Sequence, residues 1–262
     1  MLVFAGIVPH PPILIPTVGK QNIKKLKKTV VAFDILEEEL IKANPDTIIV
    51  ISPHGEINFD AFSINTCQEY KANFQAFGDF STKLSFNPDL QFINELKGKN
   101  ETKLPIQLYS DKNLDHGAAI PLYYLFRKQT KAKIVPIIYS MMSYHKHVEF
   151  GELIKETIFS LDKRYAIIAS GDLSHRLSRQ APSGFSPSAK EFDKKIIQLL
   201  KKKKLDAFLN IDQKLVEDAA ECGLRSILIL LGVIHKMNYE FEVLSYEAPF
   251  GVGYLVGQFK FA

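Results

Sequence analysis

Four histidines stand in turns punctuated by proline or glycine, each beside the end of an expected strand or helix. They are His10, His54, His116 and His175. Imidazole is a common metal ligand, and it gains and loses a proton near neutral pH. Four such groups gathered at one place could therefore hold a metal ion and carry out acid–base chemistry beside it.

The other histidines of the chain suit different roles. His145 and His147 fall in an expected polar loop, where solvated side chains are the usual outcome. His235 stands at the end of an apolar helix, where a positive charge complements the helix dipole. We therefore leave these three outside the candidate site.

Two histidines and one carboxylate on one face of a metal leave positions open for substrate and oxygen, as in non-haem iron(II) oxygenases. Zinc accepts the same donors. His10 and His54 follow the two earliest expected strands and form the natural pair. Spacing alone does not choose the carboxylate, for which the candidates are Glu221, Asp172, Asp115 and Glu247.

The elements that must position these side chains are apolar strands. The run 46–52 is mostly β-branched, reads as a buried strand, and must stop at Pro53, directly before His54. Strands expected at 2–8 and 164–170 lead in the same way towards His10 and His175. Ligands of α/β folds bind outside the carboxyl ends of parallel strands. We therefore expect several strand ends to deliver imidazoles to one edge of one sheet.

Strands and helices alternate along the rest of the chain, which indicates an α/β domain with a largely parallel sheet between helical layers. Further strands are expected at 61–66 and 133–139, and two final ones, near 239–246 and 252–260, suggest an antiparallel addition. Helices are expected near 22–43, 88–97, 118–128, 148–161, 188–203 and 224–235, with short helices within 205–219. No linker or repeat interrupts the pattern, so we expect one domain over residues 1–262.

Composition argues against nucleic-acid and membrane partners. The net charge of +4 comes largely from lysine runs at 24–28 and 201–204, which suit solvated helix faces and lack interleaved aromatic residues. The most apolar segment, 227–234, is far shorter than the roughly 20 residues that cross a bilayer. Two cysteines fit a reducing compartment, and the first residues lack the basic region of a signal peptide. We therefore expect a cytoplasmic protein.

Six segments together resemble the class III extradiol dioxygenase catalytic-subunit family, and are most similar to its AmmeMemoRadiSam-associated branch. The resemblance follows the whole chain in order. The segments are Val8-Pro9-His10-Pro11-Pro12, Ser52-Pro53-His54-Gly55, Leu114-Asp115-His116-Gly117, 169–176 around Gly171-Asp172-Leu173-Ser174-His175, Glu221-Cys222-Gly223-Leu224-Arg225-Ser226, and 245–254 around Glu247-Ala248-Pro249-Phe250-Gly251.

The resemblance implies a three-layer α/β/α fold with a mixed, largely parallel central sheet. It implies that His10, His54 and Glu221 bind iron(II), although zinc or another divalent metal could be present as isolated. His175 matches the acid/base histidine, and His116 matches the histidine near the substrate. The implied activity is extradiol cleavage of a catechol-type aromatic diol with O2, in which a histidine takes and returns a phenolic proton.

Alternatives remain open at this point. Relatives of the Memo type carry a cysteine near the third-ligand position, so Cys222 and Glu247 remain candidates beside Glu221. The chain could be a metal-binding or redox partner protein of an AmmeMemoRadiSam-type modification system without ring cleavage; a zinc hydrolase is a weaker alternative. Branch members are often fused to an AMMECR-type domain, so we expect self-association or a separately encoded partner of that type.

Overall fold

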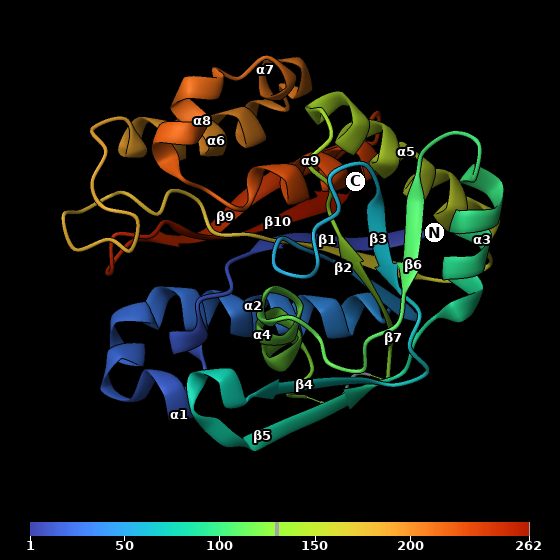
Figure 1. Cartoon of the computed structure of the whole chain (residues 1–262), viewed down its shortest axis with the longest axis horizontal. Helices are drawn as coiled ribbons and strands as arrows, with labels where there is room; N and C mark the ends of the chain where they lie inside the picture. Colours follow the sequence, from blue (N-terminus) through green and yellow to red (C-terminus); the bar gives the residue numbers. More distant parts are fainter. Residues whose placement is uncertain (129–130, 262) are drawn as a thin grey trace.

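The computed structural model describes residues 1–128 and 131–261, and a mixed sheet runs through the middle of the molecule (Figure 1). Eight described strands form this sheet. In spatial order they are β6 (Ile106–Tyr109), β3 (Phe62–Asn65), β7 (Lys133–Ile138), β2 (Thr47–Ser52), β8 (Tyr165–Ser170), β1 (Leu2–Val8), β10 (Tyr254–Phe261) and β9 (Tyr239–Glu247).

The central strands β7, β2, β8 and β1 are all parallel to one another. On one side, β10 pairs antiparallel with β1, and β9 pairs antiparallel with β10. On the other side, β3 pairs antiparallel with β7 and parallel with β6. The prediction of a mixed, largely parallel sheet with a final antiparallel addition is confirmed.

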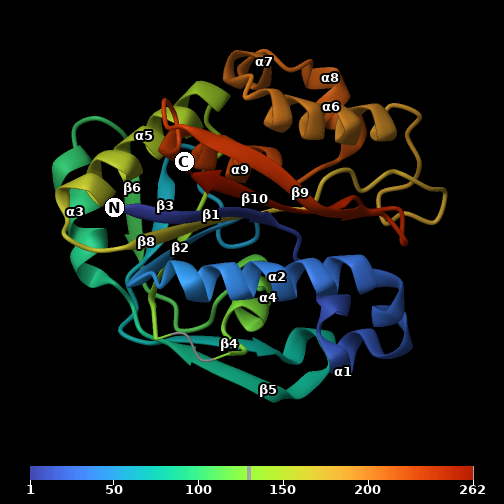
Figure 2. The same ribbon diagram turned by 180° about the vertical axis from the view of Figure 1, so that it is seen from behind.

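Helices cover both faces of the sheet and complete a three-layer α/β/α arrangement (Figures 1 and 2). One layer holds α3 (Leu90–Asn100), α5 (Tyr144–Ser160), α6 (Ala189–Lys202), α7 (Leu205–Leu209), α8 (Gln213–Ala219) and α9 (Leu224–Val233). The other holds α2 (Lys27–Ala43), α4 (His116–Leu125) and a hairpin of β4 (Tyr70–Phe74) and β5 (Asp79–Phe86). Short helical turns complete the described chain: η1 (Pro12–Leu14), α1 (Pro16–Gly19), η2 (Lys20–Leu26) and η3 (Gln75–Phe77).

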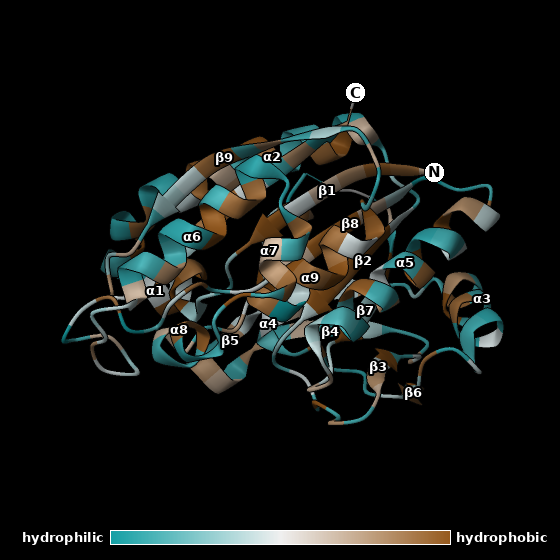
Figure 3. Ribbon diagram, turned by 90° about the horizontal axis from the view of Figure 1, so that it is seen from above, coloured by the Kyte–Doolittle hydropathy of each residue, from teal (hydrophilic) through white to brown (hydrophobic). Residues whose placement is uncertain are grey.

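Burial on both faces explains the unbroken apolar runs of the central strands. In β2, Ile49 and Ile51 pack into the core beneath α5 and α9, whereas Ile48 and Val50 pack into the core beneath α2 and α4. Figure 3 shows the hydrophobic residues concentrated in β2, β8 and α9, while α6 is largely hydrophilic. No described helix combines the length and the apolar character that a bilayer crossing needs.

The structure departs from the sequence expectations at α5, which begins at Tyr144, four residues before the expected start. His145 and His147 therefore lie on a helix and not in a polar loop. His145 is exposed as expected, but the prediction of a solvated His147 is wrong. The His147 ring is buried against Phe62, and its two nitrogens lie 2.8 Å and 3.0 Å from the carbonyl oxygens of Ser143 and Ser140.

Candidate functional site

The candidate site lies at the carboxyl ends of three adjacent parallel strands. The strand β1 leads to His10, β2 leads to His54, and β8 leads to His175. Each strand is an apolar run that ends in a turn, so the chain leaves the sheet at the edge where neighbouring parallel strands also end. The structure thus brings together histidines separated by more than 100 residues in the chain.

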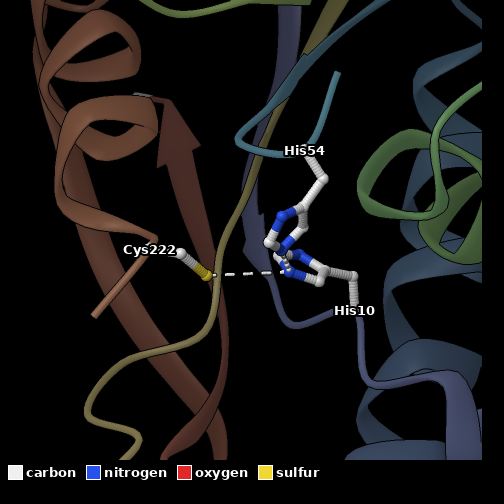
Figure 4. Close-up of side chains that lie close together, drawn as sticks. All are labelled: His10, His54 and Cys222. Atoms are coloured by element: carbon white, nitrogen blue, oxygen red, sulfur yellow. Dashed lines mark hydrogen bonds between the residues drawn. The ribbon is translucent and has the colours of Figure 1, made fainter. Parts of the chain in front are cut away.

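The rings of His10 and His54 face each other through their outer nitrogens. Their Nε2 atoms are 2.8 Å apart, and the ring planes are perpendicular. The Sγ atom of Cys222 lies 3.7 Å from Nε2 of His10 and points towards it (Figure 4). One ligand atom from each of these three residues lies within 4.8 Å of the other two, so the three could share one metal ion.

The spacing of these three atoms fits a small divalent metal. Two nitrogens bound tetrahedrally to Zn²⁺ stand about 3.3 Å apart, and a bound nitrogen and thiolate sulfur about 3.6 Å apart. The observed separations are 2.8 Å between the nitrogens and 3.7 Å between the sulfur and the His10 nitrogen. A small rotation of one imidazole ring would therefore admit the ion.

Electrostatics around His10 also suit a metal ligand. The His10 side chain is 2% exposed. Burial, reinforced by the neighbouring histidines 54, 116 and 175, holds the pKa of His10 well below its usual range. The imidazole is therefore neutral near pH 7, which is the form that binds metals.

His116 occupies the first position of α4 and completes the group of imidazoles. Its ring stacks on the ring of His54 with centroids 4.2 Å apart, and it lies edge-on to His10 at 5.5 Å. Asp115 caps the helix by accepting a hydrogen bond from the amide of Ala118 at 3.2 Å, which fixes where His116 emerges. Burial lowers the pKa of His116.

His175 approaches the site from the loop after β8, together with Asp172. The Oδ1 atom of Asp172 accepts a hydrogen bond from the His10 amide at 3.0 Å, and its Oδ2 lies 3.8 Å from Nε2 of His175. That separation is too long for a direct hydrogen bond. Burial raises the pKa of Asp172 to about 7 and lowers the pKa of His175. Burial thus favours the neutral form of both side chains.

Glu221 is not part of the three-residue cluster. Its Oε2 atom accepts a hydrogen bond from the amide of Leu224 at 2.5 Å, at the start of α9. Burial raises its pKa to about 7. The contact with the helix N-terminus matches the charge complementation expected there. The assignment of Glu221 as a metal ligand stays a prediction.

The carboxylate of Glu247 is hydrogen-bonded to the start of α2. Its Oε1 atom accepts hydrogen bonds from the amide and the hydroxyl of Thr29 in the first turn of α2, at 2.8 Å and 2.7 Å. These contacts connect the end of β9 to α2. They give Glu247 a structural role that sequence spacing alone could not reveal.

A backbone contact brings Cys222 to the histidines. Gly171 and Gly223 approach so closely that a Cβ on Gly171 would collide with the Cα of Gly223. The amide of Asp172 then donates to Sγ of Cys222 at 3.2 Å, and the amide of Cys222 donates to the Asp172 carbonyl at 3.3 Å. Cys222 is a free thiol, and burial raises its pKa well above the ordinary value.

Sequence reasoning missed one buried hydroxyl at the site. Ser170 ends β8, and its Oγ atom lies 2.9 Å from Nδ1 of His10 and 2.5 Å from the carbonyl oxygen of Gly117. A serine at the last position of a buried strand, directly before Gly171 and Asp172, was the available signal. The hydroxyl joins three segments: the end of β1, the end of β8 and the start of α4.

A cavity of about 510 Å³ borders His54. It lies between the loop after β2 and the loop that leads from β6 to α4. Its lining is polar and acidic: His54, Gly55, Glu56, Tyr109, Ser110, Asp111, Asn113, Leu114 and Asp115. A small molecule in this cavity would lie beside His54, one of the clustered imidazoles.

Comparison with known proteins adds independent evidence. The family model described as the catalytic LigB subunit of aromatic ring-opening dioxygenase matches residues 5–257. Protein CA_C1420 of Clostridium acetobutylicum is 33% identical over 258 residues, which cover 95% of this chain and 55% of that protein. The chain thus spans about half the length of that relative.

Two further similarities are informative. The 3,4-dihydroxyphenylacetate 2,3-dioxygenase of Escherichia coli is 25% identical over 218 residues, which cover 76% of this chain and 78% of the enzyme. The crystal structure of uncharacterized protein JW3007 from Escherichia coli K12 superposes with a TM-score of 0.69, covering 98% of this chain and 99% of that one at 14% identity. The latter similarity concerns the fold alone.

Proposed function

Because the chain belongs to the LigB family of catalytic subunits of aromatic ring-opening dioxygenases, we propose that it cleaves a catechol-type aromatic diol with O2 in an iron(II)-dependent, extradiol reaction. The observation that best supports this proposal is the pair of Nε2 atoms of His10 and His54, 2.8 Å apart. Both come from the carboxyl ends of strands in the sheet of an α/β fold, where ligands bind.

Each residue of the site has a defined part in this proposal. His10 and His54 hold the metal, which when bound supplies the attachment point for the diol and for oxygen. His175 takes the second phenolic proton and later returns it, with Asp172 3.8 Å away as its neighbour. His116, stacked on His54, lies beside the ring of the substrate.

The cavity beside His54 indicates the kind of diol. Its lining includes the acidic residues Glu56, Asp111 and Asp115, and no lysine or arginine. A carboxylate on the substrate would be repelled there, whereas a neutral or amine-bearing diol would not. We therefore propose a neutral or cationic diol, in contrast to the carboxylated substrate that the name of the Escherichia coli relative indicates.

The test separates the roles of the histidines. Protein purified without oxygen is loaded with iron(II), and oxygen uptake is measured with neutral, amine-bearing and carboxylated catechols. We expect His175→Ala to retain iron but to lose on the order of 10²–10⁴ in rate, because a positioned acid/base group is removed. We expect His54→Ala to lose both iron and activity.

His116→Ala is the intermediate case, with a loss of roughly 10–100-fold in affinity or rate. Iron lost in His175→Ala would make His175 a ligand and contradict the mechanism. Wild-type protein that binds metal but consumes no oxygen with any diol would contradict ring cleavage itself.

A second function is favoured by the position of Cys222. Its Sγ atom lies 3.7 Å from Nε2 of His10, within the cluster of ligand atoms. Two histidines and a thiolate suit zinc or copper, whereas two histidines and a carboxylate suit iron(II) and oxygen. With Cys222 as third ligand, the chain would be a metal-binding partner protein that acts with a separately encoded protein and opens no ring.

Paired substitutions decide between these ligand sets. If Glu221 is the third ligand, Glu221→Gln will lower iron(II) affinity while Cys222→Ser leaves it unchanged. If Cys222 is the third ligand, Cys222→Ser will lower metal affinity while Glu221→Gln leaves it unchanged. Metal content measured by elemental analysis and Co²⁺ absorption spectra will separate the two, because a cobalt–thiolate bond gives an intense near-ultraviolet band that Cys222→Ser would abolish.

A further inference from the structure

The hydroxyl of Ser170 lies between His10 and the backbone of α4. Ser170 is fully buried at the end of β8. Its Oγ atom is 2.9 Å from Nδ1 of His10 and 2.5 Å from the carbonyl oxygen of Gly117. These two contacts together decide where the proton of the His10 ring resides.

A hydroxyl has one proton to donate, and a carbonyl oxygen can only accept. The proton of Ser170 therefore points to Gly117, and its oxygen must accept a hydrogen bond from Nδ1–H of His10. A neutral imidazole carries only one N–H group. The Nε2 atom of His10 is then left with a free lone pair, directed towards Nε2 of His54 at 2.8 Å.

We propose that Ser170 is a positioning residue that fixes His10 in the Nδ1-protonated tautomer, so that Nε2 is ready to bind a metal. This inference rests on the metal site of the proposed function and adds a residue to it. Because the His10 ring would otherwise be free to carry its proton on Nε2, a form that cannot bind metal, losing the hydroxyl must lower metal affinity.

Metal binding requires a lone pair on Nε2 of both histidines, and these two atoms lie 2.8 Å apart. The proton of His10 can stay on Nδ1 when a metal binds, because it is hydrogen-bonded to Ser170 there.

Nitrogen-15 NMR of the histidine side chains tests this directly in metal-free protein. The two tautomers give different ¹⁵N shifts and different couplings to the ring protons, and His10 is assigned by its disappearance in His10→Gln. We expect wild-type His10 to be protonated on Nδ1. In Ser170→Ala we expect a mixture of tautomers, together with a loss of roughly 10–100-fold in Zn²⁺ affinity measured against a competing chelator.

Ser174→Ala is the matched control. Ser174 is also fully buried, lies on the loop that follows Ser170, and donates its hydroxyl proton to a backbone carbonyl, that of Ala219, at 2.8 Å. Because this hydroxyl makes no contact with His10, Ser174→Ala will keep the wild-type tautomer and Zn²⁺ affinity. A role for Ser170 in stability alone would leave the tautomer of His10 unchanged.

Two results would overturn the inference. One is wild-type His10 carrying its proton on Nε2, a measurement that needs no variant to fold. The other is Ser170→Ala with the same His10 tautomer and Zn²⁺ affinity as Ser174→Ala. Neither readout involves ring cleavage, so a protein that opens no diol would contradict the proposed function while both readouts still support the role of Ser170.

Discussion

At the scale of single residues, burial sets the protonation of the carboxyl groups around the site. It raises the pKa of Asp172 and of Glu221 to about 7, and that of Asp193 to about 6. Asp193 differs from the other two because it belongs to α6 and contacts the loop of His175 through Ser174. Its Oδ1 accepts from the amide of Ser174 at 2.8 Å and its Oδ2 from the hydroxyl of Tyr246 at 2.6 Å.

Asp193 should make the free energy of unfolding depend on pH. Its pKa is about 6 in the folded protein and close to 4 in an unfolded chain. Between these values the folded state keeps a proton that the unfolded state releases, so stability falls as pH rises from about 4 to 6. The difference of about two pKa units corresponds to about 3 kcal/mol. Urea unfolding of wild type and Asp193→Asn across pH 4–7 measures this loss of stability.

The asparagine variant should lack this part of the pH dependence. Its amide oxygen can accept from Ser174, and its amide nitrogen can donate to the Tyr246 oxygen, so both contacts are kept. Tyr246→Phe removes a hydrogen bond that lowers the pKa of Asp193, so this pKa should rise further. The free energy of unfolding should then keep falling to a higher pH than in the wild type. Identical pH profiles for wild type and Asp193→Asn would contradict this account.

At the scale of elements, pairs of glycines set how closely segments approach. Gly171 and Gly223 bring the loop after β8 against the start of α9, which places Cys222 beside His10. Gly151 of α5 and Gly232 of α9 make a second close contact, where a Cβ on Gly232 would lie 3.0 Å from the Cα of Gly151 and collide with the Val148 carbonyl oxygen. Both contacts involve backbone, which cannot move aside as a side chain can.

Gly232→Ala should therefore lower the free energy of unfolding, by about 1–3 kcal/mol, because it overpacks the crossing of two helices. Gly98→Ala is the control within α3, where an added Cβ meets nothing within 4 Å. This exposed helical glycine should gain roughly 0.5–1 kcal/mol when replaced. Chemical unfolding of both variants gives the comparison, and equal effects would show that helix propensity, not packing, governs Gly232.

The sequence predicted the elements whose patterns are local and strong. The apolar runs before His10, His54 and His175 identified the strands β1, β2 and β8, because strands buried on both faces contain few polar residues. The strands β4, β5 and β6 were not predicted. The strand β4 alternates between buried and less buried residues but has only five residues, whereas β5 and β6 bury few residues and alternate weakly.

Contacts between distant segments were less accessible to sequence reasoning. The proximity of Cys222 to His10 depends on the Gly171–Gly223 approach, which no periodicity encodes. The burial of His147 depends on where α5 begins and on the ring of Phe62. Sequence patterns thus identified the strands that carry the candidate ligands, whereas the packing of loops determines which side chains meet.

At the scale of the whole molecule, the candidate metal site joins both ends of the chain. His10 and His54 are 44 residues apart, and Cys222 lies 212 residues beyond His10. An ion bound by these residues would bind only the folded state, since an unfolded chain seldom brings such distant groups together. Metal binding should therefore be visible as global stabilisation.

Zn²⁺ at 100 times its dissociation constant should add about 2.7 kcal/mol to the free energy of unfolding. For a protein of this length, each kcal/mol raises the Tm by about 2–4 °C. Differential scanning calorimetry with and without the ion measures the shift. His54→Ala should show no shift, and His145→Ala, which removes an exposed histidine of α5, should keep it. An equal shift in both variants would mean that zinc binds elsewhere.

Because β1 pairs with β10, the order of the segments along the chain could be changed by circular permutation. These strands are neighbours and antiparallel, with Ala5 opposite Phe259, so the chain starts and finishes at the same edge of the sheet (Figure 1). The histidines stand at the opposite edge, beyond the last residues of β1 and β2. Within residues 1–261, a linker could join the start of β1 to the end of β10, and a break could be opened at the exposed Gly184. Such a circular permutant would keep every strand pairing, so the order in which the ligands are synthesised could be changed without moving them in space.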